Sequence, residues 1–270
     1  MSPVSLWWDF LEVMNFPVSI SAIVIDLDGT LLHTAPELAE AANRMLRDMG
    51  RSPVSQDLLM SYIGNGIHWL VKRALTGSLR QSEAESYDTG GGCGQHSRTS
   101  RLRAPSPAAD MHAEPDAALF AKALPIFEKY YSELLLESKP FPHVIEGLDA
   151  MKAAGFRLGC ITNKIERYTQ PLLKGIGLAH YFDIVLAGDT LTEKKPSPLP
   201  LLHSAKFFGV PIEQLLLVGD SLSDVMAARA AGCPIFCVLY GYNHGEPVET
   251  LNVDAVISNL TGVLPLIQRV

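Results

Sequence analysis

Apolar residues form short continuous runs along most of the chain, and segments with helical apolar spacing separate them. Runs that are apolar throughout, rather than at every second position, are typical of strands buried on both faces of a parallel sheet. Segments 143–155 and 223–232 have helical spacing and end at Gly155 and Gly232, a common way for a helix to stop. We therefore predict an α/β fold with a Rossmann-like, three-layer parallel sheet core. The predicted strands are residues 20–26, 156–162, 182–188, 215–220, 234–240 and 254–258.

The stretch between residues 34 and 140 has no comparable apolar run and is helical in pattern. Pro36 suits the first turn of a helix, and Pro125 is expected to kink or divide the last helix. This pattern indicates a helical domain, residues 34–140, inserted into a core of residues 20–33 and 141–270, after an N-terminal extension, residues 1–19. The predicted helices of the insert are residues 36–50, 55–63, 66–75 and 116–137.

Residues 78–114 are rich in Gly, Ser, Arg and Pro and poor in large apolar side chains. This composition predicts a disordered insertion within the helical domain, with a functional binding loop as the alternative. At the N-terminus, either Met1 or Met14 could be the start, because the intervening residues precede the first predicted strand.

Composition limits the classes of partner. The chain of 270 residues is 47% hydrophobic and 19% charged, with a formal net charge of −7, so it has no basic footprint for nucleic acid. No apolar stretch approaches the ~20 residues of a membrane span, and the first residues make a poor signal peptide. We expect a cytoplasmic protein, a monomer or homodimer, in which an anionic ligand needs a local cation.

The cysteines are also consistent with a cytoplasmic location. Their spacing fits no structural zinc site. Three of them lie in or beside apolar runs and are expected to be small buried hydrophobes in a reducing cytosol. The four cysteines are Cys93, Cys160, Cys233 and Cys237, the last three being those in apolar surroundings.

Polar side chains that could take part in catalysis or metal binding follow several predicted strands. Each of these motifs alone is more often a turn, a solvated loop or a helix cap. Because the carboxyl ends of parallel strands meet at one edge of a sheet, their occurrence in order favours a single active site. The residues are Asp26 and Asp28 after the first strand, Thr162 after the second, Lys195 after the third, and Asp220 and Asp224 after the fourth.

These motifs, "DLDGT", the Thr of "ITN", the Lys of "KKP" and "GDSLSD", resemble the four motifs of the haloacid dehalogenase-like hydrolase superfamily. The helical insert is similar in place to the cap domain of that superfamily. Within it, "YIGNG" with "LVKRAL", and "GYNHG" after the fifth strand, resemble phosphoglycolate phosphatases.

The resemblance implies a phosphomonoester hydrolase that works through an aspartyl-phosphate. Asp26 is the implied nucleophile, and Asp28 the implied general acid and base, with Gly29 giving the turn its freedom. Thr162 is expected to bind a phosphate oxygen, and Lys195 to neutralise charge on Asp26 and the transferred group. Lys194 is the alternative to Lys195.

The resemblance also implies Mg²⁺, held by the carboxylates of Asp26 and Asp220 and the main-chain carbonyl of Asp28. Asp224 is expected to orient these ligands from outside. In the cap, backbone N–H groups of Gly64, Asn65 and Gly66 are expected to bind the small carboxylate of the substrate, with a plain helix–helix turn as the alternative.

The leading hypothesis is hydrolysis of 2-phosphoglycolate to glycolate and phosphate. A phosphosugar mutase, or a phosphatase for another small phosphorylated metabolite, would use the same aspartates. A haloacid dehalogenase needs no metal and lacks the second aspartate, so Asp28 argues against it. A catalytically silent binding protein is the alternative from another class.

Overall fold

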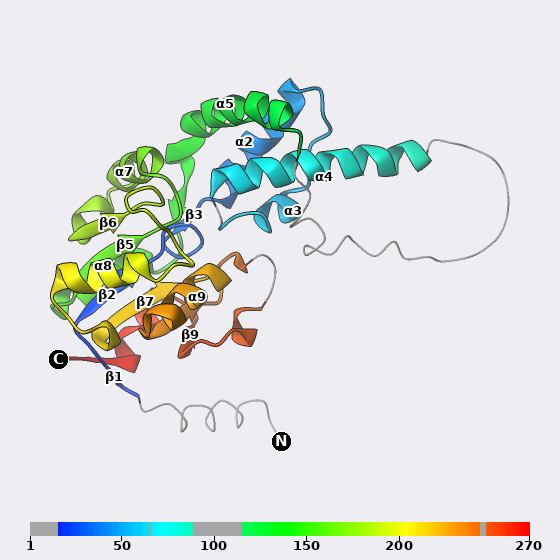
Figure 1. Cartoon of the computed structure of the whole chain (residues 1–270). Coiled ribbons are helices and arrows are strands. Elements are labelled where there is room, and N and C mark those ends of the chain that lie inside the picture. Colours follow the sequence, from blue (N-terminus) through cyan, green and yellow to red (C-terminus); the bar gives the residue numbers. More distant parts are fainter. Residues whose placement is uncertain (1–15, 65, 89–114, 244–246) are drawn as a thin grey trace, which may run out of the picture. The chain divides into compact units, whose positions relative to one another are not determined.

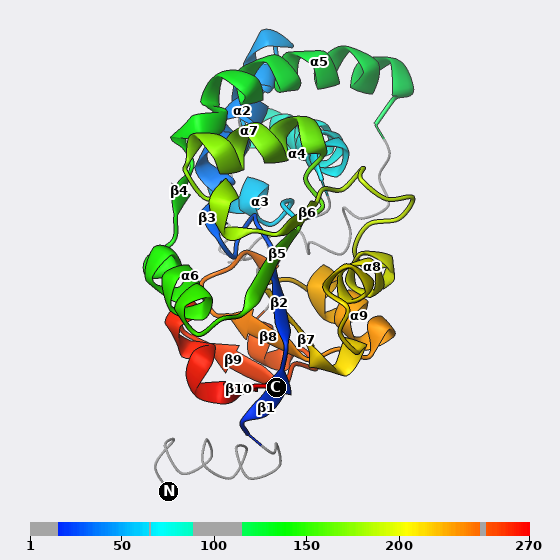
Figure 2. The same cartoon turned by 90° about the vertical axis from the view of Figure 1, so that its left-hand side faces the viewer.

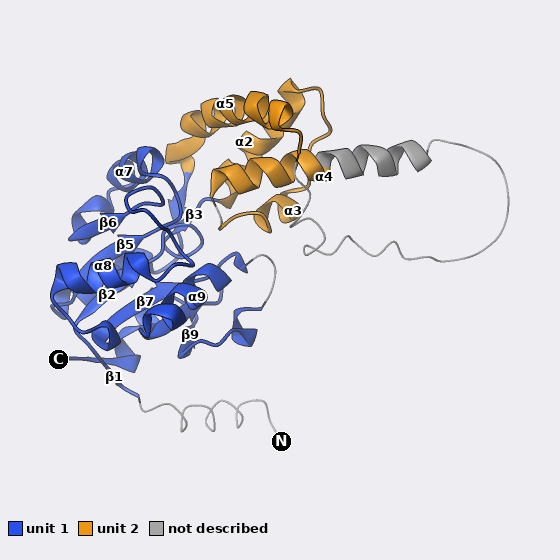
Figure 3. Cartoon of the chain, in the orientation of Figure 1, with its two compact units in different colours: residues 1–34, 138–270 blue, residues 35–137 orange. Residues whose placement is uncertain are grey.

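The computed structural model describes residues 16–64, 66–88, 115–243 and 247–270, with side chains omitted for 78–88. The chain forms two compact units: unit 1 contains residues 1–34 and 138–270, and unit 2 contains residues 35–137 (Figure 3). Among the described helices, none is long and apolar enough to cross a membrane.

Unit 1 is built on a six-stranded sheet whose neighbouring strands are all parallel (Figure 1). The strand order is β6-β5-β2-β7-β8-β9, so the chain passes through the sheet from its centre to both edges. All six predicted strands are confirmed, each slightly shorter than its apolar run. Their bounds are β2 Ala22–Ile25, β5 Arg157–Ile161, β6 Ile184–Leu186, β7 Leu215–Gly219, β8 Ile235–Val238 and β9 Ala255–Ile257.

Helices cover both faces of this sheet, which gives the three layers predicted from the sequence. Figure 2 shows α8 and α9 on one side of the strands and α6 on the other. The layer of α8 and α9 packs on the central strands through Leu201, Phe208, Val225 and Leu217. The helices are α6 Val144–Ala153, α7 Glu166–Gly175, α8 Leu199–Phe208 and α9 Leu222–Ala231.

Two expected helix stops are observed. α9 ends before Gly232, whose φ of 79° is the left-handed conformation of a C-terminal cap. α6 ends two residues before Gly155, which has a φ of 82°. Short 3₁₀ turns follow several elements of unit 1, at Ala179–Tyr181, Ile212–Gln214, Val248–Thr250, Leu260–Gly262 and Leu264–Leu266.

The first apolar run is two strands rather than one, which corrects the expected N-terminal extension. β1 (Val18–Ile20) pairs in parallel with β10 (Ile267–Arg269), outside the main sheet. Ser21 separates it from β2, because its amide and hydroxyl donate to the carbonyl and side-chain oxygens of Gln214. Residues 18 and 19 therefore belong to the fold; residues 1–15, including Met14, lie outside the described part of the chain.

A short antiparallel pair lies where the chain passes between the units. β3 (Leu32–His33) pairs with β4 (Lys139–Pro140), with Leu32 opposite Pro140 and His33 opposite Lys139. Helix α2 of unit 2 begins two residues after β3, and unit 2 ends at Glu137, just before β4. Both connections between the units therefore run through this pair.

Among the residues of unit 2 that the structure describes, 35–64, 66–88 and 115–137, all regular secondary structure is helical. Its interior is formed by buried side chains such as Met45, Leu59, Val71 and Phe127. Asp116 caps α5, since its carboxylate accepts from the Ala118 amide. The helices are α2 Ala35–Asp48, α3 Gln56–Met60, α4 Ile67–Asp88 and α5 Ala117–Leu134, followed by a 3₁₀ turn at Leu135–Glu137.

Two expectations for unit 2 need correction. α5 runs through Pro125 as one helix, so the proline does not divide it. α4 continues to Asp88, so residues 78–88 of the expected insertion are helical. Leu, Arg, Gln, Glu and Ala in that stretch favour a helix, and the first glycine comes only at position 90. Residues 89–114, with Cys93, lie outside the described residues, and their disorder stays a prediction.

The expectation for the other cysteines is confirmed. Cys160, Cys233 and Cys237 are free and buried. Burial raises the pKa of the Cys233 thiol to about 12 and raises the pKa of the other two as well, so all three behave as neutral packing groups.

Replacing Gly147 in α6 by alanine is expected to lower the free energy of unfolding by about 1–3 kcal/mol. A Cβ at this position would lie 2.6 Å from Cβ of Leu260 and 3.0 Å from its carbonyl carbon, so the C-terminal turn has to shift. Urea unfolding of Gly147→Ala measures the change. The control is Glu146→Ala on the exposed side of the same helix, expected within about 0.5 kcal/mol of wild type. Equal stability of the two variants would contradict this packing.

Candidate active site

The predicted residues of the core meet at the carboxyl edge of the sheet. Ile25 of β2 is opposite Cys160 of β5 and Val218 of β7, so the residues that follow these strands are neighbours. Asp26 continues the ladder by donating its amide to the Val218 carbonyl at 2.9 Å. Thr162 and Asp220 follow β5 and β7 in the same way, and all three are buried.

Lys195 is the central cation of this edge. Its Nζ lies 2.7 Å from Oδ1 of Asp26 and 2.6 Å from Oδ1 of Asp224, and it donates to the Ile161 carbonyl at 3.0 Å. The side chain is buried, whereas Lys194 is exposed. The structure therefore brings Lys195, and not Lys194, to Asp26.

A second lysine contacts the other aspartate of the first motif. Nζ of Lys164 lies 2.9 Å from Oδ1 of Asp28, and the lysine side chain is buried. Lys164 also donates its amide to Oγ1 of Thr162 at 3.1 Å. Each aspartate of "DLD" thus faces its own buried ammonium group, which orients it and offsets its charge.

Asp220 is held by two segments that are far from it and from each other in the chain. Its Oδ1 accepts from Oγ1 of Thr30 at 3.0 Å, and its Oδ2 accepts from the amide of Tyr242 at 2.8 Å. A Cβ on Gly29 or Gly241 would overlap this carboxyl group, and Gly29 has a φ of 91°. Both glycines are needed because the main chain approaches Asp220 so closely.

The carboxylate of Asp224 is engaged by protein donors on both oxygens. Oδ1 accepts from Lys195, and Oδ2 accepts from the Ser221 hydroxyl at 2.6 Å and from the amides of Ser221 and Asp220. With Ser221 it forms a capping box at the start of α9. These bonds suit a residue that positions Lys195 and the Asp220 loop.

Burial dominates the electrostatics of the cluster. Burial raises the pKa of Asp26 well above its ordinary value, Lys195 opposes this, and the Asp224 and Asp220 carboxylates add to it. Burial and the Asp224 carboxylate raise the pKa of Asp220 to about 7. Burial alone would lower the pKa of Lys195, but Asp224 and Asp26 raise it above its ordinary value. The lysine therefore stays charged.

The three buried carboxylates have the character of a metal site. One oxygen from each of Asp26, Asp220 and Asp224 lies within 4.8 Å of the others. Carboxylate oxygens are the ligands that Mg²⁺ prefers. Burial makes it costly for these aspartates to be charged, and a divalent cation would offset that charge. Because Asp224 is occupied by four protein donors, Asp26 and Asp220 fit the role of side-chain ligands better.

The predicted cap loop belongs to unit 2. Gly64 and Gly66 have φ values of 118° and 92°, so both adopt backbone conformations that other residues avoid. Asn65 lies outside the described residues. The contact of this loop with a substrate stays a prediction.

Several contributors to the site were not identified from the sequence. The motif "ITNK" contained the signal for Lys164 and for Asn163, whose Nδ2 donates to the Lys195 carbonyl at 3.0 Å. Thr30 stands within "DLDGT" itself. For Tyr242, no sequence pattern indicates the bond from its amide to Asp220.

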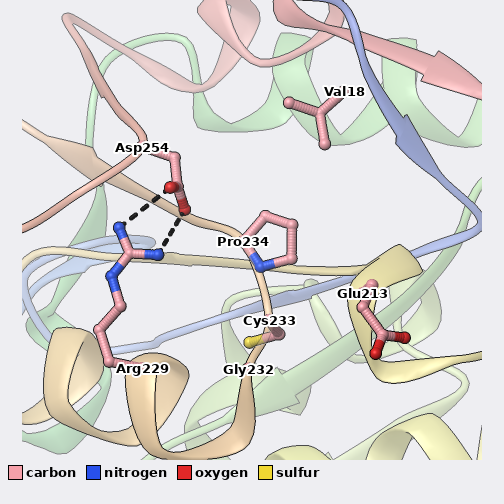
Figure 4. A pocket seen from close by; sticks show the side chains of 7 residues that line it. All are labelled: Val18, Glu213, Arg229, Gly232, Cys233, Pro234 and Asp254. Atoms are coloured by element: carbon pink, nitrogen blue, oxygen red, sulfur yellow. Dashed lines mark hydrogen bonds and ion pairs between the residues drawn. The ribbon is translucent and has the colours of Figure 1, made fainter. Parts of the chain in front are cut away.

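A separate pocket of about 380 Å³ lies near the amino ends of the strands (Figure 4). Its lining includes Val18 of β1 and Pro234, which precedes β8. Arg229, the cation among its lining residues, makes a two-bond ion pair with Asp254 at 2.9 and 3.0 Å. A cation already neutralised in this way makes the pocket a poor site for a phosphate group.

Fold and site together define an α/β enzyme with a carboxylate–lysine centre at the carboxyl edge of its sheet. A family model described as haloacid dehalogenase-like hydrolase matches residues 23–238. The chain belongs to the haloacid dehalogenase-like hydrolase family.

Proteins similar to this chain indicate which kind of hydrolase it is. The chain is 50% identical over 247 residues to a phosphoglycolate phosphatase from Thiobacillus denitrificans, covering 91% of this chain and 95% of the relative. It is 37% identical over 253 residues to the phosphoglycolate phosphatase of Escherichia coli, covering 93% of this chain and 94% of that protein. A crystal structure described as a predicted phosphoglycolate phosphatase from Haemophilus somnus matches with a TM-score of 0.76 and 32% identity, over 91% and 96% of the two chains. These relatives indicate an enzyme of the phosphatase class.

Asp224 and Asp26 are expected to contribute differently to the free energy of unfolding, measured in EDTA so that no metal is bound. Asp224→Asn should lower the free energy of unfolding by about 3–5 kcal/mol, because an amide cannot accept on both sides and Lys195 loses a buried partner. Asp26→Asn should change it by only about 1 kcal/mol, because Lys195 keeps Asp224 and the repulsion among carboxylates falls.

Denaturant unfolding of both variants beside wild type measures these changes. Equal losses in the two variants would show that Asp224 is not the structural member of the cluster.

Proposed function

We propose that the chain hydrolyses 2-phosphoglycolate to glycolate and inorganic phosphate through an aspartyl-phosphate on Asp26. The observation that carries the proposal is the pair of aspartates at the sheet edge, each against its own buried lysine, at 2.7 and 2.9 Å. The names of relatives 37–50% identical over nearly the whole chain support the choice of substrate.

In the first step the carboxylate of Asp26 attacks phosphorus and the bond from phosphorus to the glycolate oxygen breaks. Asp28, in its protonated form, gives a proton to that oxygen as it leaves, so glycolate departs with its hydroxyl restored and Asp28 becomes a carboxylate beside Lys164. Lys195, whose Nζ is already beside Asp26, offsets negative charge that gathers between the nucleophile and the phosphoryl group.

In the second step Asp28 takes a proton from a water molecule that attacks phosphorus. The bond between phosphorus and Asp26 breaks, inorganic phosphate leaves, and both aspartates return to their starting states. Lys164, whose Nζ forms an ion pair with the Asp28 carboxylate at 2.9 Å, is proposed to hold Asp28 in place for both proton transfers.

Thr162 is proposed to bind a phosphate oxygen through its buried hydroxyl. The proposed cofactor is Mg²⁺, held by Asp26, Asp220 and the carbonyl of Asp28. When bound, it supplies positive charge that lets an anionic carboxylate approach an anionic phosphate. Asp224 keeps Lys195 and the Asp220 loop in position from outside.

Unit 2 is proposed to act as the cap that selects the leaving group. The backbone N–H groups of Gly64 and Gly66 are proposed to bind the carboxylate of the substrate, and the positive φ of both glycines brings the main chain into a conformation that other residues avoid. A cytoplasmic location and a monomeric or homodimeric state stay predictions of the sequence.

The direct test is phosphate release from 2-phosphoglycolate by the purified protein. We expect turnover with Mg²⁺, its loss in EDTA and its return when Mg²⁺ is added. Asp26→Asn should reduce the rate by roughly 10³-fold or more, because an amide is not a nucleophile. Turnover in EDTA, or unchanged release by Asp26→Asn, would contradict the mechanism. Interconversion of sugar phosphates without phosphate release would indicate a mutase instead.

Gly64→Ala is expected to raise KM for 2-phosphoglycolate by roughly 10- to 100-fold, the cost of losing hydrogen bonds to a charged group. The KM for p-nitrophenyl phosphate, which has no carboxylate, should change little. Gly50→Ala is the matched control, because Gly50 also lies in unit 2 with a positive φ, 68°, and nothing would contact its Cβ within 4 Å. Equal effects on both substrates would refute carboxylate binding by this loop.

A further inference from the structure

The β3–β4 pair, through which both connections to unit 2 pass, is covered by four aromatic rings. We call His33, Phe141, Tyr240 and Tyr242 the aromatic cluster. Ring centroids lie 4.4 Å apart for Phe141 and Tyr240, 5.1 Å for His33 and Phe141, and 6.0 Å for His33 and Tyr242. One member, His33, belongs to β3, and Phe141 directly follows β4.

Hydrogen bonds attach this cluster to the main chain that leads into unit 2. The hydroxyl of Tyr242 accepts from the Thr34 amide at 2.8 Å and lies 3.0 Å from Nδ1 of His33. The hydroxyl of Tyr240 donates to the Thr30 carbonyl at 2.7 Å. Thr34 is fully buried, so its amide depends on a protein acceptor.

The segment 240–243, which carries two of these rings, also contacts Asp220, the proposed metal ligand. The amide of Tyr242 donates to Oδ2 of Asp220 at 2.8 Å, and Gly241 lies against the same carboxyl group. Next in the chain, Oδ1 of Asn243 accepts from the amide of Leu222 at the start of α9. Tyr242 therefore touches Asp220 with its main chain and β3 with its side chain.

We propose that Tyr242 is a positioning residue that couples the β3–β4 pair to Asp220. Because Tyr242 is buried and hydrogen-bonded at both ends, to Thr34 through its hydroxyl and to Asp220 through its amide, a shift of the Thr34 amide is expected to displace the Tyr242 amide. The coupling makes the geometry of the Asp220 carboxylate depend on the strands that carry unit 2. The inference rests on the proposed function in one respect, that Asp220 is a Mg²⁺ ligand.

The test is Tyr242→Phe, which keeps the ring and the amide bond to Asp220 but removes the acceptor for Thr34. The matched control is Tyr181→Phe, another buried tyrosine of unit 1, whose hydroxyl donates to Oδ1 of Asp149 at 2.7 Å. Each variant removes one buried tyrosine hydroxyl, which has two partners in Tyr242 (Thr34 and His33) and one in Tyr181, so a general loss of stability affects both.

Two readouts need no substrate. Calorimetric titration with Mg²⁺ should show about two- to tenfold weaker binding by Tyr242→Phe, the effect of one hydrogen bond, and unchanged binding by Tyr181→Phe. Hydrogen exchange should be faster for residues 32–36 in Tyr242→Phe and unchanged there in Tyr181→Phe.

Wild-type Mg²⁺ affinity in Tyr242→Phe, or equal weakening in both variants, would overturn the coupling. Unchanged exchange at residues 32–36 would overturn the contact on which it depends. A phosphate-release assay that fails on 2-phosphoglycolate would refute the substrate but leave both of these readouts to decide the present inference.

Discussion

The site depends on one buried ammonium group. Nζ of Lys195 lies 2.7 Å from Asp26 and 2.6 Å from Asp224. Burial at this edge of the sheet disfavours the charged form of Asp26 and raises its pKa. Without this cation the aspartates could not lie so close together as ions. The surrounding chain serves its placement: the Ile161 carbonyl accepts from its Nζ, the Asn163 side chain binds its carbonyl, and Asp224 is itself fixed by the capping box of α9. The position of Asp26 therefore depends on three different loops.

The second constraint is space around Asp220. Gly29 and Gly241 bring two loops so near this carboxyl group that no larger residue fits, and Thr30 and Tyr242 bond its two oxygens. Asp220 is thus oriented before any ligand binds, which reduces the reorganisation that a metal or phosphate would require. The Tyr242 side chain lies against β3, where its hydroxyl accepts from the Thr34 amide and lies 3.0 Å from Nδ1 of His33.

Much of the core could be predicted from sequence because a parallel sheet collects its chemistry at one edge. Asp26, Thr162 and Asp220 directly follow recognisable apolar runs, so finding the strands brought them together, whereas Lys195 was chosen by its resemblance to a family motif. Pairings that depend on the folded chain were not predictable in this way. Lys164 and Asp28 are far apart in sequence, β1 pairs with β10 from the other end of the chain, and the Tyr242 amide carries no side-chain signal.

The end of α4 was missed because a polar composition was given more weight than the helix propensity of residues 78–88.

The central claim is that Asp26 is the residue that carries the phosphoryl group. Borohydride reduces an acyl phosphate on aspartate to homoserine, so enzyme quenched during turnover of 2-phosphoglycolate, reduced and analysed by peptide mass spectrometry reports the site directly. The account predicts homoserine at position 26 and unmodified aspartate at position 28, with no conversion when substrate is left out. Reduction at position 28, or rapid turnover with aspartate intact at both positions, would contradict it.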